Sequence, residues 1–150
     1  MSGIDAKMKG YIIGGEVLPV LPGYGFVANA GFPSPAADFV EEEIDLNKYL
    51  IPRPNATYIV RAVGDSMVNA HIPDNTLLVV DRSIKPINNR IVVAVINNEF
   101  TIKRFIQNSS GIRLVPESPN PRYKPIPIVE GMDFSIWGVV THIIIKAADV

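Results

Sequence analysis

Two side chains in this sequence could together form a nucleophile and its base: the hydroxyl of Ser66 and the amine of Lys103. Ser66 stands in Gly64-Asp65-Ser66-Met67, directly after a run with the composition of a strand. A Gly-Asp-Ser segment that leaves a strand can turn sharply and present the serine hydroxyl at the rim of a sheet. Serine is a poor nucleophile until a neighbouring base removes its proton. Without such a base, Ser66 is an ordinary loop residue that caps a neighbouring amide.

Neither histidine is well placed to be that base. His71 lies five residues after Ser66, in what reads as the same loop. His142 lies in the run Val139-Val140-Thr141-His142-Ile143, which reads as a strand, so a solvent-facing or hydrogen-bonded strand residue is the simpler interpretation.

Lys103 is a base of a different kind. On a strand over 99–106, Thr101, Lys103 and Phe105 share one face and Arg104 lies on the other, so one of the two cations must face partly apolar surroundings. A buried lysine loses proton affinity, and its neutral amine can take a proton from serine. Arginine cannot, because it stays protonated in proteins. The alternative is a lysine whose amine reaches the solvent.

The composition excludes several other kinds of site. The chain has no cysteine and two histidines, which excludes disulfides, a thiol nucleophile and a cysteine-ligated zinc. Two histidines are also too few for a histidine-built metal site, so we expect no metal and no cofactor. The 150 residues suffice for one domain, and 14 Lys+Arg against 15 Asp+Glu leave no basic surface for direct, sequence-specific DNA binding.

The apolar stretch over 11–27 resembles a secretion signal, since two lysines precede it and Ala28-Asn29-Ala30 ends it. Glu16, Pro19 and Pro22 interrupt it, however, so it cannot form an apolar helix. No window reaches the roughly 20 mostly apolar residues that a membrane span needs. We therefore expect a cytoplasmic protein that does not enter a membrane.

The elements that would position these side chains change along the chain. Residues 1–35 are rich in glycine and proline and predict an extended arm with little regular structure. The apolar residues of this arm indicate that it lies against its own domain or against a partner. A helix is expected next, with Ser34 as N-cap, Pro35 in the first turn and an apolar stripe over 39–44, ending before Pro52.

From residue 58 onward the pattern is that of strands. Runs rich in valine, isoleucine, phenylalanine and tyrosine are separated by asparagine, aspartate, proline and glycine. They occupy residues 58–63, 77–81, 91–96, 99–106, 112–116 and 134–145. Asn97-Asn98 between two runs predicts a tight hairpin, because asparagine tolerates positive φ. The fold class we expect is mainly β: a compact antiparallel domain with one short helix and the extended N-terminal arm.

The motifs, taken in order, resemble those of the LexA/UmuD family of self-cleaving Ser-Lys peptidases. They are Ala30-Gly31, Gly64-Asp65-Ser66-Met67, Thr101-Ile102-Lys103 and Trp137-Gly138-Val139-Val140. The resemblance covers residues 27–146 and is greatest to the UmuD branch, although Ala30-Gly31 has the form found in the LexA branch. Residues 69–76 depart from the family pattern, since they lack its Gly-Ile and Asp-Gly-Asp elements, and residues 116–123 are slightly longer than usual.

The resemblance implies a role for each of these positions. Ser66 would be the nucleophile, Lys103 the general base and Ala30-Gly31 the bond that is cut. The backbone amides of Ser66 and Met67 would help to hold the oxyanion. The chain would then consist of a removable arm, residues 1–30, and a peptidase and dimerisation β-domain, residues 31–150.

The resemblance also implies a function. A LexA-type repressor needs a helix-turn-helix domain before the cut, whereas here 30 residues rich in glycine and proline precede it. We therefore expect a UmuD-type protein of the SOS response to DNA damage, a serine peptidase that cuts its own chain once. RecA on single-stranded DNA would stimulate the cut. The truncated homodimer would serve a UmuC-type error-prone polymerase in translesion synthesis and SOS mutagenesis.

Two other classes of protein stay open at this point. A signal-peptidase-like enzyme would share the Ser-Lys chemistry but would need a membrane anchor, and it would cut added peptides. A non-catalytic β interaction module would leave Ser66 and Lys103 as ordinary surface residues, and it would never cut itself.

Overall fold

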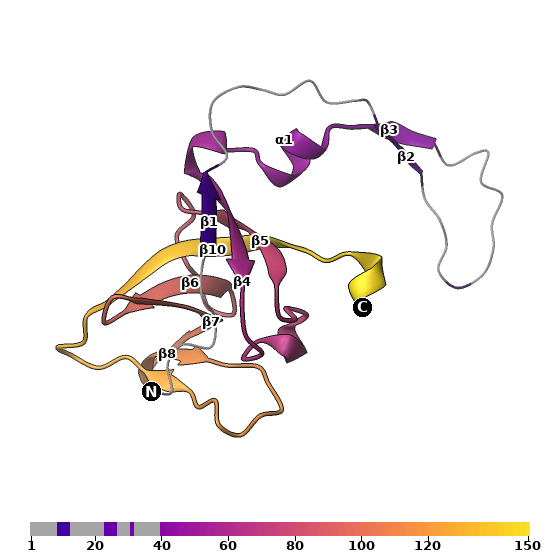
Figure 1. Cartoon of the computed structure of the whole chain (residues 1–150). Coiled ribbons are helices and arrows are strands. Elements are labelled where there is room, and N and C mark those ends of the chain that lie inside the picture. The colour runs from indigo at the N-terminus through magenta and orange to yellow at the C-terminus, as the bar shows by residue number, and fades with distance from the viewer. Residues whose placement is uncertain (1–8, 13–22, 27–30, 32–39) are drawn as a thin grey trace.

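The computed structural model describes residues 9–12, 23–26, 31 and 40–150, and strands dominate them (Figure 1). Eight strands form one sheet in the order β1-β4-β5-β10-β6-β7-β8-β9, and a separate pair joins β2 to β3. The strands are β1 (Lys9–Ile12), β2 (Gly23–Phe26), β3 (Val40–Ile44), β4 (Thr57–Ala62), β5 (Thr76–Asp81), β6 (Ile91–Ile96), β7 (Glu99–Asn108), β8 (Gly111–Val115), β9 (Ile126–Pro127) and β10 (Phe134–Ile144). Neighbouring strands run antiparallel throughout, which confirms the expected fold class.

The six strands expected from residue 58 onward are all present, with ends that differ by two residues at most. The hairpin between β6 and β7 turns at Asn97 and Asn98, whose φ angles are 49° and 64°. Two successive positive φ values belong to the turn type whose twist matches that of the flanking strands. Local sequence signals therefore determined this part of the sheet.

The helix expected after Ser34 is wrong over the residues that the structure describes. Val40–Ile44 is strand β3, which pairs with β2, and this pairing outweighs a weak local preference for helix. The short helix α1 begins later, at Leu46–Leu50, where Asp45 caps it by accepting from the amides of Asn47 and Lys48. The expected cap, Ser34, lies outside the described residues. No helix in the described ranges is long and apolar enough to cross a membrane.

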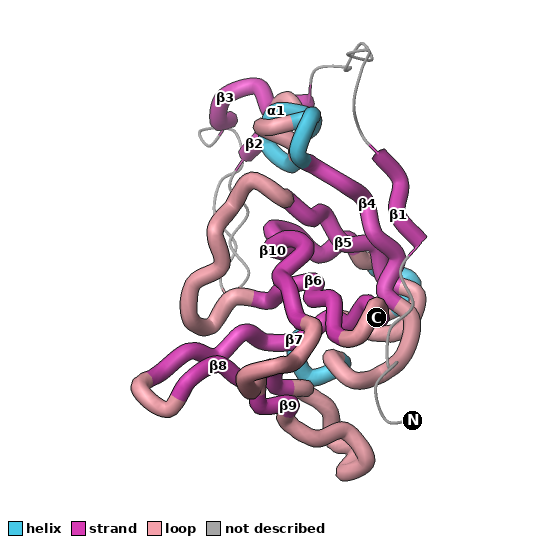
Figure 2. The backbone as a smooth tube through the Cα atoms, turned by 90° about the vertical axis from the view of Figure 1, so that its left-hand side faces the viewer, coloured by secondary structure: helices cyan, strands magenta, loops and turns pink. Residues whose placement is uncertain are grey.

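Two segments of the arm are strands, so the expectation of little regular structure is wrong for them. β1 pairs with β4 from Lys9↔Arg61 to Ile12↔Tyr58, so this part of the arm lies against its own domain. In Figures 1 and 2, the β2–β3 pair and α1 lie together at one end of the molecule. β1 is the first strand of the sheet order, and β4 therefore has a neighbour on both sides.

The long strand β10 connects the two halves of the sheet. It pairs with β5 on one side and β6 on the other, and its register shifts once against each partner. Buried side chains form two clusters. One contains Val60, Leu78 and Val140 with residues of the loop after β4, and the other contains Val92, Phe105 and Leu114. The core thus reaches from the strands into the loop that carries Ser66.

Candidate active site

The segment that carries Ser66 turns sharply as it leaves β4. We call residues 63–75, between β4 and β5, the serine loop. Gly64 adopts φ 110°, which side chains rarely tolerate, and its N–H donates to Asp74 Oδ1 at 2.8 Å. The turn folds Ser66 inward, so that only 2% of this residue is exposed. Gly64 and Asp74 together stabilise the turn that precedes Ser66.

The serine loop is packed into the core. Met67, Ala70 and Ile72 belong to the same buried cluster as the strand residues, and Val68–Ala70 forms a turn of 3₁₀ helix. His71 ends this turn with φ 65°, and Asn75 follows with φ 68°. These two residues take the left-handed backbone that glycine adopts most easily. The serine loop therefore makes both turns without glycine at these two positions.

Lys103 is buried in the middle of β7, with 2% of the residue exposed. Its Nζ lies 3.3 Å from Ser66 Oγ, 2.7 Å from Thr101 Oγ1 and 3.2 Å from the Ile102 carbonyl oxygen. A lysine that reaches the solvent is thereby excluded. The chain thus brings together a serine and a lysine that are 37 residues apart in sequence.

Burial lowers the pKa of Lys103 from 10.5 to about 7, because the apolar surroundings penalise the charged amine. A neutral amine has two N–H groups to donate and one lone pair to accept with. The Ile102 carbonyl and the Thr101 hydroxyl can accept the two hydrogen bonds that the neutral amine donates. The lone pair on Nζ can then accept a hydrogen bond from the Ser66 hydroxyl. At neutral pH this lysine is therefore available as a base for serine.

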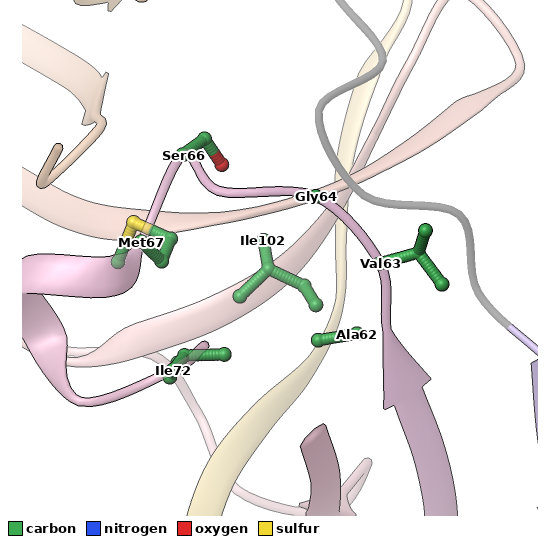
Figure 3. A pocket seen from close by; sticks show the side chains of 7 residues that line it. All are labelled: Ala62, Val63, Gly64, Ser66, Met67, Ile72 and Ile102. Carbon is green, nitrogen blue, oxygen red and sulfur yellow. The ribbon is translucent and has the colours of Figure 1, made fainter. Parts of the chain in front are cut away.

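A small apolar hollow lies beside Ser66 (Figure 3). It is lined by Ala62, Val63, Gly64, Ser66, Met67, Ile72 and Ile102. Apart from the serine hydroxyl, the side chains that line it are apolar. A hollow of this kind suits a small apolar side chain of a bound peptide.

The main chain at Ser66 and Met67 is bonded through its carbonyl groups. The Ser66 carbonyl accepts from the N–H of Glu117, and the Met67 carbonyl accepts from the N–H groups of Ala70 and Ile72. Among the described residues, the N–H groups of Ser66 and Met67 have no protein acceptor. Both amides can therefore donate to a substrate oxygen.

The other sequence candidates lie elsewhere. His71 is exposed at the end of its turn. The His142 Nδ1 lies 3.1 Å from Thr141 Oγ1 and its ring packs against Tyr49, which makes it the hydrogen-bonded strand residue that we expected. Gly31 is exposed, and Ala30 lies outside the described residues.

Sequence reasoning missed three residues that contact the site. Thr101 accepts from Lys103, and the alternation of β7, which places both on one face, could have revealed it. Glu117 donates its N–H to the Ser66 carbonyl, and Tyr123 donates its hydroxyl to Asp65. No local sequence pattern predicts either contact, because each joins segments that are about 50 residues or more apart in the chain.

Comparison with known proteins agrees with this site. The model of the Peptidase S24-like family matches residues 19–141. SamA of Salmonella typhimurium is 49% identical over 117 residues, which cover 78% of this chain and 79% of SamA. ImpA of Escherichia coli is 44% identical over 125 residues, 83% of each chain, and MucA of Escherichia coli is 40% identical over 126 residues, 84% of this chain and 85% of MucA.

The family match and these identities decide between the classes left open by the sequence. They exclude a non-catalytic module and a signal-peptidase-like enzyme, because they extend over most of the chain rather than over one motif. The chain belongs to the Peptidase S24-like family, as a UmuD-like, self-cleaving Ser-Lys peptidase of SOS mutagenesis.

Proposed function

We propose that Ser66 is the nucleophile and Lys103 the general base of one cut in this chain's own Ala30-Gly31 bond. The observation that carries the proposal is the contact of 3.3 Å between Ser66 Oγ and Lys103 Nζ in a buried site. Catalytic hydrogen bonds are often this long before substrate binds, and they shorten in the reacting complex.

The reaction proceeds in two stages. The neutral Lys103 amine takes the Ser66 proton as Oγ attacks the Ala30 carbonyl carbon, and the amides of Ser66 and Met67 donate to the oxyanion. Protonated Lys103 then gives its proton to the Gly31 nitrogen, which leaves as the amine of residues 31–150. Lys103 then takes a proton from water, whose oxygen attacks the ester carbon on Ser66. The bond from Ser66 Oγ to this carbon breaks, Oγ receives the proton back from Lys103, and the carboxylate of residues 1–30 is released.

The hollow beside Ser66 supports the choice of the bond. Its apolar lining suits the small methyl group of Ala30. Gly31 adds no side chain on the other side of the bond, so the extended chain can approach the buried serine closely. Delivery of the bond by the same chain replaces a bimolecular encounter and lowers the barrier by several kcal/mol.

The relatives support a biological role for this cut. Residues 1–30 are the removable arm and residues 31–150 the peptidase and dimerisation domain of a cytoplasmic protein. A RecA filament on single-stranded DNA stimulates the cut by binding preferentially the conformer whose arm occupies the site. The homodimer of residues 31–150 then binds a UmuC-type polymerase, and UmuD-like relatives support a partner of the polymerase V type.

The test is to incubate the purified chain without RecA from pH 6 to pH 10 and to weigh the products. With a lysine pKa of about 7, the cleavage rate should rise about tenfold between pH 6 and pH 8 and then level off. Mass spectrometry should find only residues 1–30 and 31–150.

Ser66→Ala and Lys103→Ala should each abolish the cut and leave the fold intact. Ser109→Ala and Lys146→Ala are matched controls, since both residues are exposed, and they should cut like the parent. Cleavage that persists in either active-site variant would rule out the assignment. Cleavage at another bond would leave the dyad standing and refute the choice of Ala30-Gly31.

A further inference from the structure

A second segment of the chain is hydrogen-bonded to the serine loop. Residues 116–123 follow β8, and Glu117 binds the serine loop twice through its main chain. Its N–H donates to the Ser66 carbonyl at 2.8 Å, and its carbonyl accepts from the N–H of Asn69 at 2.8 Å. The nucleophile and the turn after it are therefore hydrogen-bonded to one residue of another segment.

The side chain of Glu117 joins the same residue to β7. Arg104 Nε donates to Oε2 at 2.9 Å and Nη2 donates to Oε1 at 3.2 Å, which is the two-pronged geometry of a strong guanidinium–carboxylate pair. Arg104 also donates through Nη1 to the Asn89 carbonyl at 2.9 Å. Both side chains are about two-thirds shielded from solvent, so the pair is less screened than one on the open surface.

Arg104 is the chain neighbour of Lys103, on the opposite face of β7. Ser66 and Lys103 are thus connected twice: directly through Oγ and Nζ, and indirectly from the Ser66 carbonyl through Glu117 and Arg104 to the strand that carries the lysine. The second connection contains no reacting atom. It limits how far Ser66 Oγ can move away from Lys103 Nζ.

We propose that Glu117 is a positioning residue of the self-cleavage reaction. Its carboxylate, paired with Arg104, keeps the serine loop packed against Lys103. This inference rests on the proposed roles of Ser66 and Lys103. Tyr123 of the same segment adds a second tie by donating to Asp65, next to the nucleophile. If the serine loop moved away from Lys103, it would therefore have to break the hydrogen bonds to Glu117 and the hydrogen bond to Tyr123.

The groups around Lys103 determine what loosening the loop would do. Ser66 faces the amine from the serine loop, Thr101 and the Ile102 carbonyl face it from β7, and buried Val92 lies opposite Lys103 on β6. The nearby charged groups Asp65, Arg104 and Glu117 are all engaged in the contacts described above. Burial is the cause of the lowered pKa, so admitting water would raise the pKa of Lys103 toward 10.5.

The experiment is the pH profile of self-cleavage for the full chain carrying Glu117→Ala, Glu117→Gln, Arg104→Ala or both alanine changes. Glu117→Ala should move the midpoint up by about one pH unit, so the rate falls about fivefold at pH 7 and recovers to within about twofold at pH 10. Glu117→Gln keeps one acceptor for Arg104 and should move the midpoint less. The double variant should have the same midpoint as the two single alanine variants, since each of the three lacks the pair between Glu117 and Arg104.

Glu130→Ala and Arg113→Ala remove exposed residues of the same types and should keep the parent's profile. Thermal unfolding followed by circular dichroism shows that each variant is folded over the pH range used. A folded Glu117→Ala protein with the parent's midpoint overturns the inference, and so does a rate lowered equally at every pH. If Ser66→Ala still cuts, the assignment of the dyad fails; if it does not and Glu117→Ala behaves like the parent, only the role of Glu117 fails.

Discussion

At the scale of single residues, the reactivity of this site depends on the burial of the Lys103 amine. Lys103 lies in a strand whose neighbours Ile102 and Thr101 are also buried, and Val92 lies across from it. Such surroundings lower the pKa of the lysine to about 7 through burial, which penalises the charged amine. Burying this lysine therefore lowers the free energy of unfolding, because the lysine is charged in the unfolded chain and loses its charge more easily in the folded one.

This cost predicts a pH dependence of stability. Between pH 7 and pH 10.5 the unfolded state binds more protons than the folded state, so the lysine destabilises the fold increasingly as the pH falls, down to about pH 7. In an uncleavable Ser66→Ala background, Lys103→Met should raise the free energy of unfolding. The gain should be several kcal/mol larger at pH 6 than at pH 10.

Urea unfolding at pH 6, 8 and 10 measures the gain. Lys146→Met, at an exposed position, is the control and should show no such trend with pH. A gain from Lys103→Met that stays constant from pH 6 to pH 10 would mean that the buried lysine keeps its ordinary pKa.

At the scale of elements, β10 holds the two halves of the sheet together where the site is assembled. It pairs with β5, which follows the serine loop, and with β6, which pairs with the lysine strand β7. Its register shifts next to Gly138, where the backbone of β10 approaches Val80 of β5 closely. A Cβ atom at Gly138 would lie 2.6 Å from Val80 Cγ1 and 3.3 Å from Arg82 Cγ.

Gly138→Ala should therefore destabilise the fold by about 1–3 kcal/mol through overpacking. Ser135→Ala, at an exposed position of the same strand, is the matched control and should change the free energy of unfolding by no more than about 0.5 kcal/mol. Chemical denaturation of both variants in the Ser66→Ala background provides the measurement. Equal stability of the two variants would show that β10 can move away from Val80 at no cost.

At the scale of the whole molecule, the proposed cut removes part of the sheet. Residues 1–30 include β1, which pairs with β4, and β2, which pairs with β3. Without β1, strand β4 becomes the edge of the sheet, because its other neighbour is β5. The reaction therefore changes which backbone groups can pair with another chain.

Hydrogen exchange detects this change. Amides of β4 that face β1 in the uncut Ser66→Ala chain should lose protection by at least about tenfold in the fragment 31–150, because exchange follows local opening. Amides between β5 and β10 should exchange alike in both proteins, and they serve as the internal control. Unchanged protection of residues 58–61 would show that β1 does not shield this edge in solution.

Much of the fold was readable from the sequence because alternation and turn residues act over a few positions. The alternation along 99–106 placed Lys103 and Thr101 on one face, and Asn97-Asn98 marked the hairpin. The ordered motifs likewise identified the family. The tertiary structure alone decided three things: that β2 draws Val40–Ile44 into a strand, that the lysine face is the buried one, and that Glu117 reaches Ser66. Burial and contacts between distant segments depend on how the strands assemble, and no local pattern encodes them.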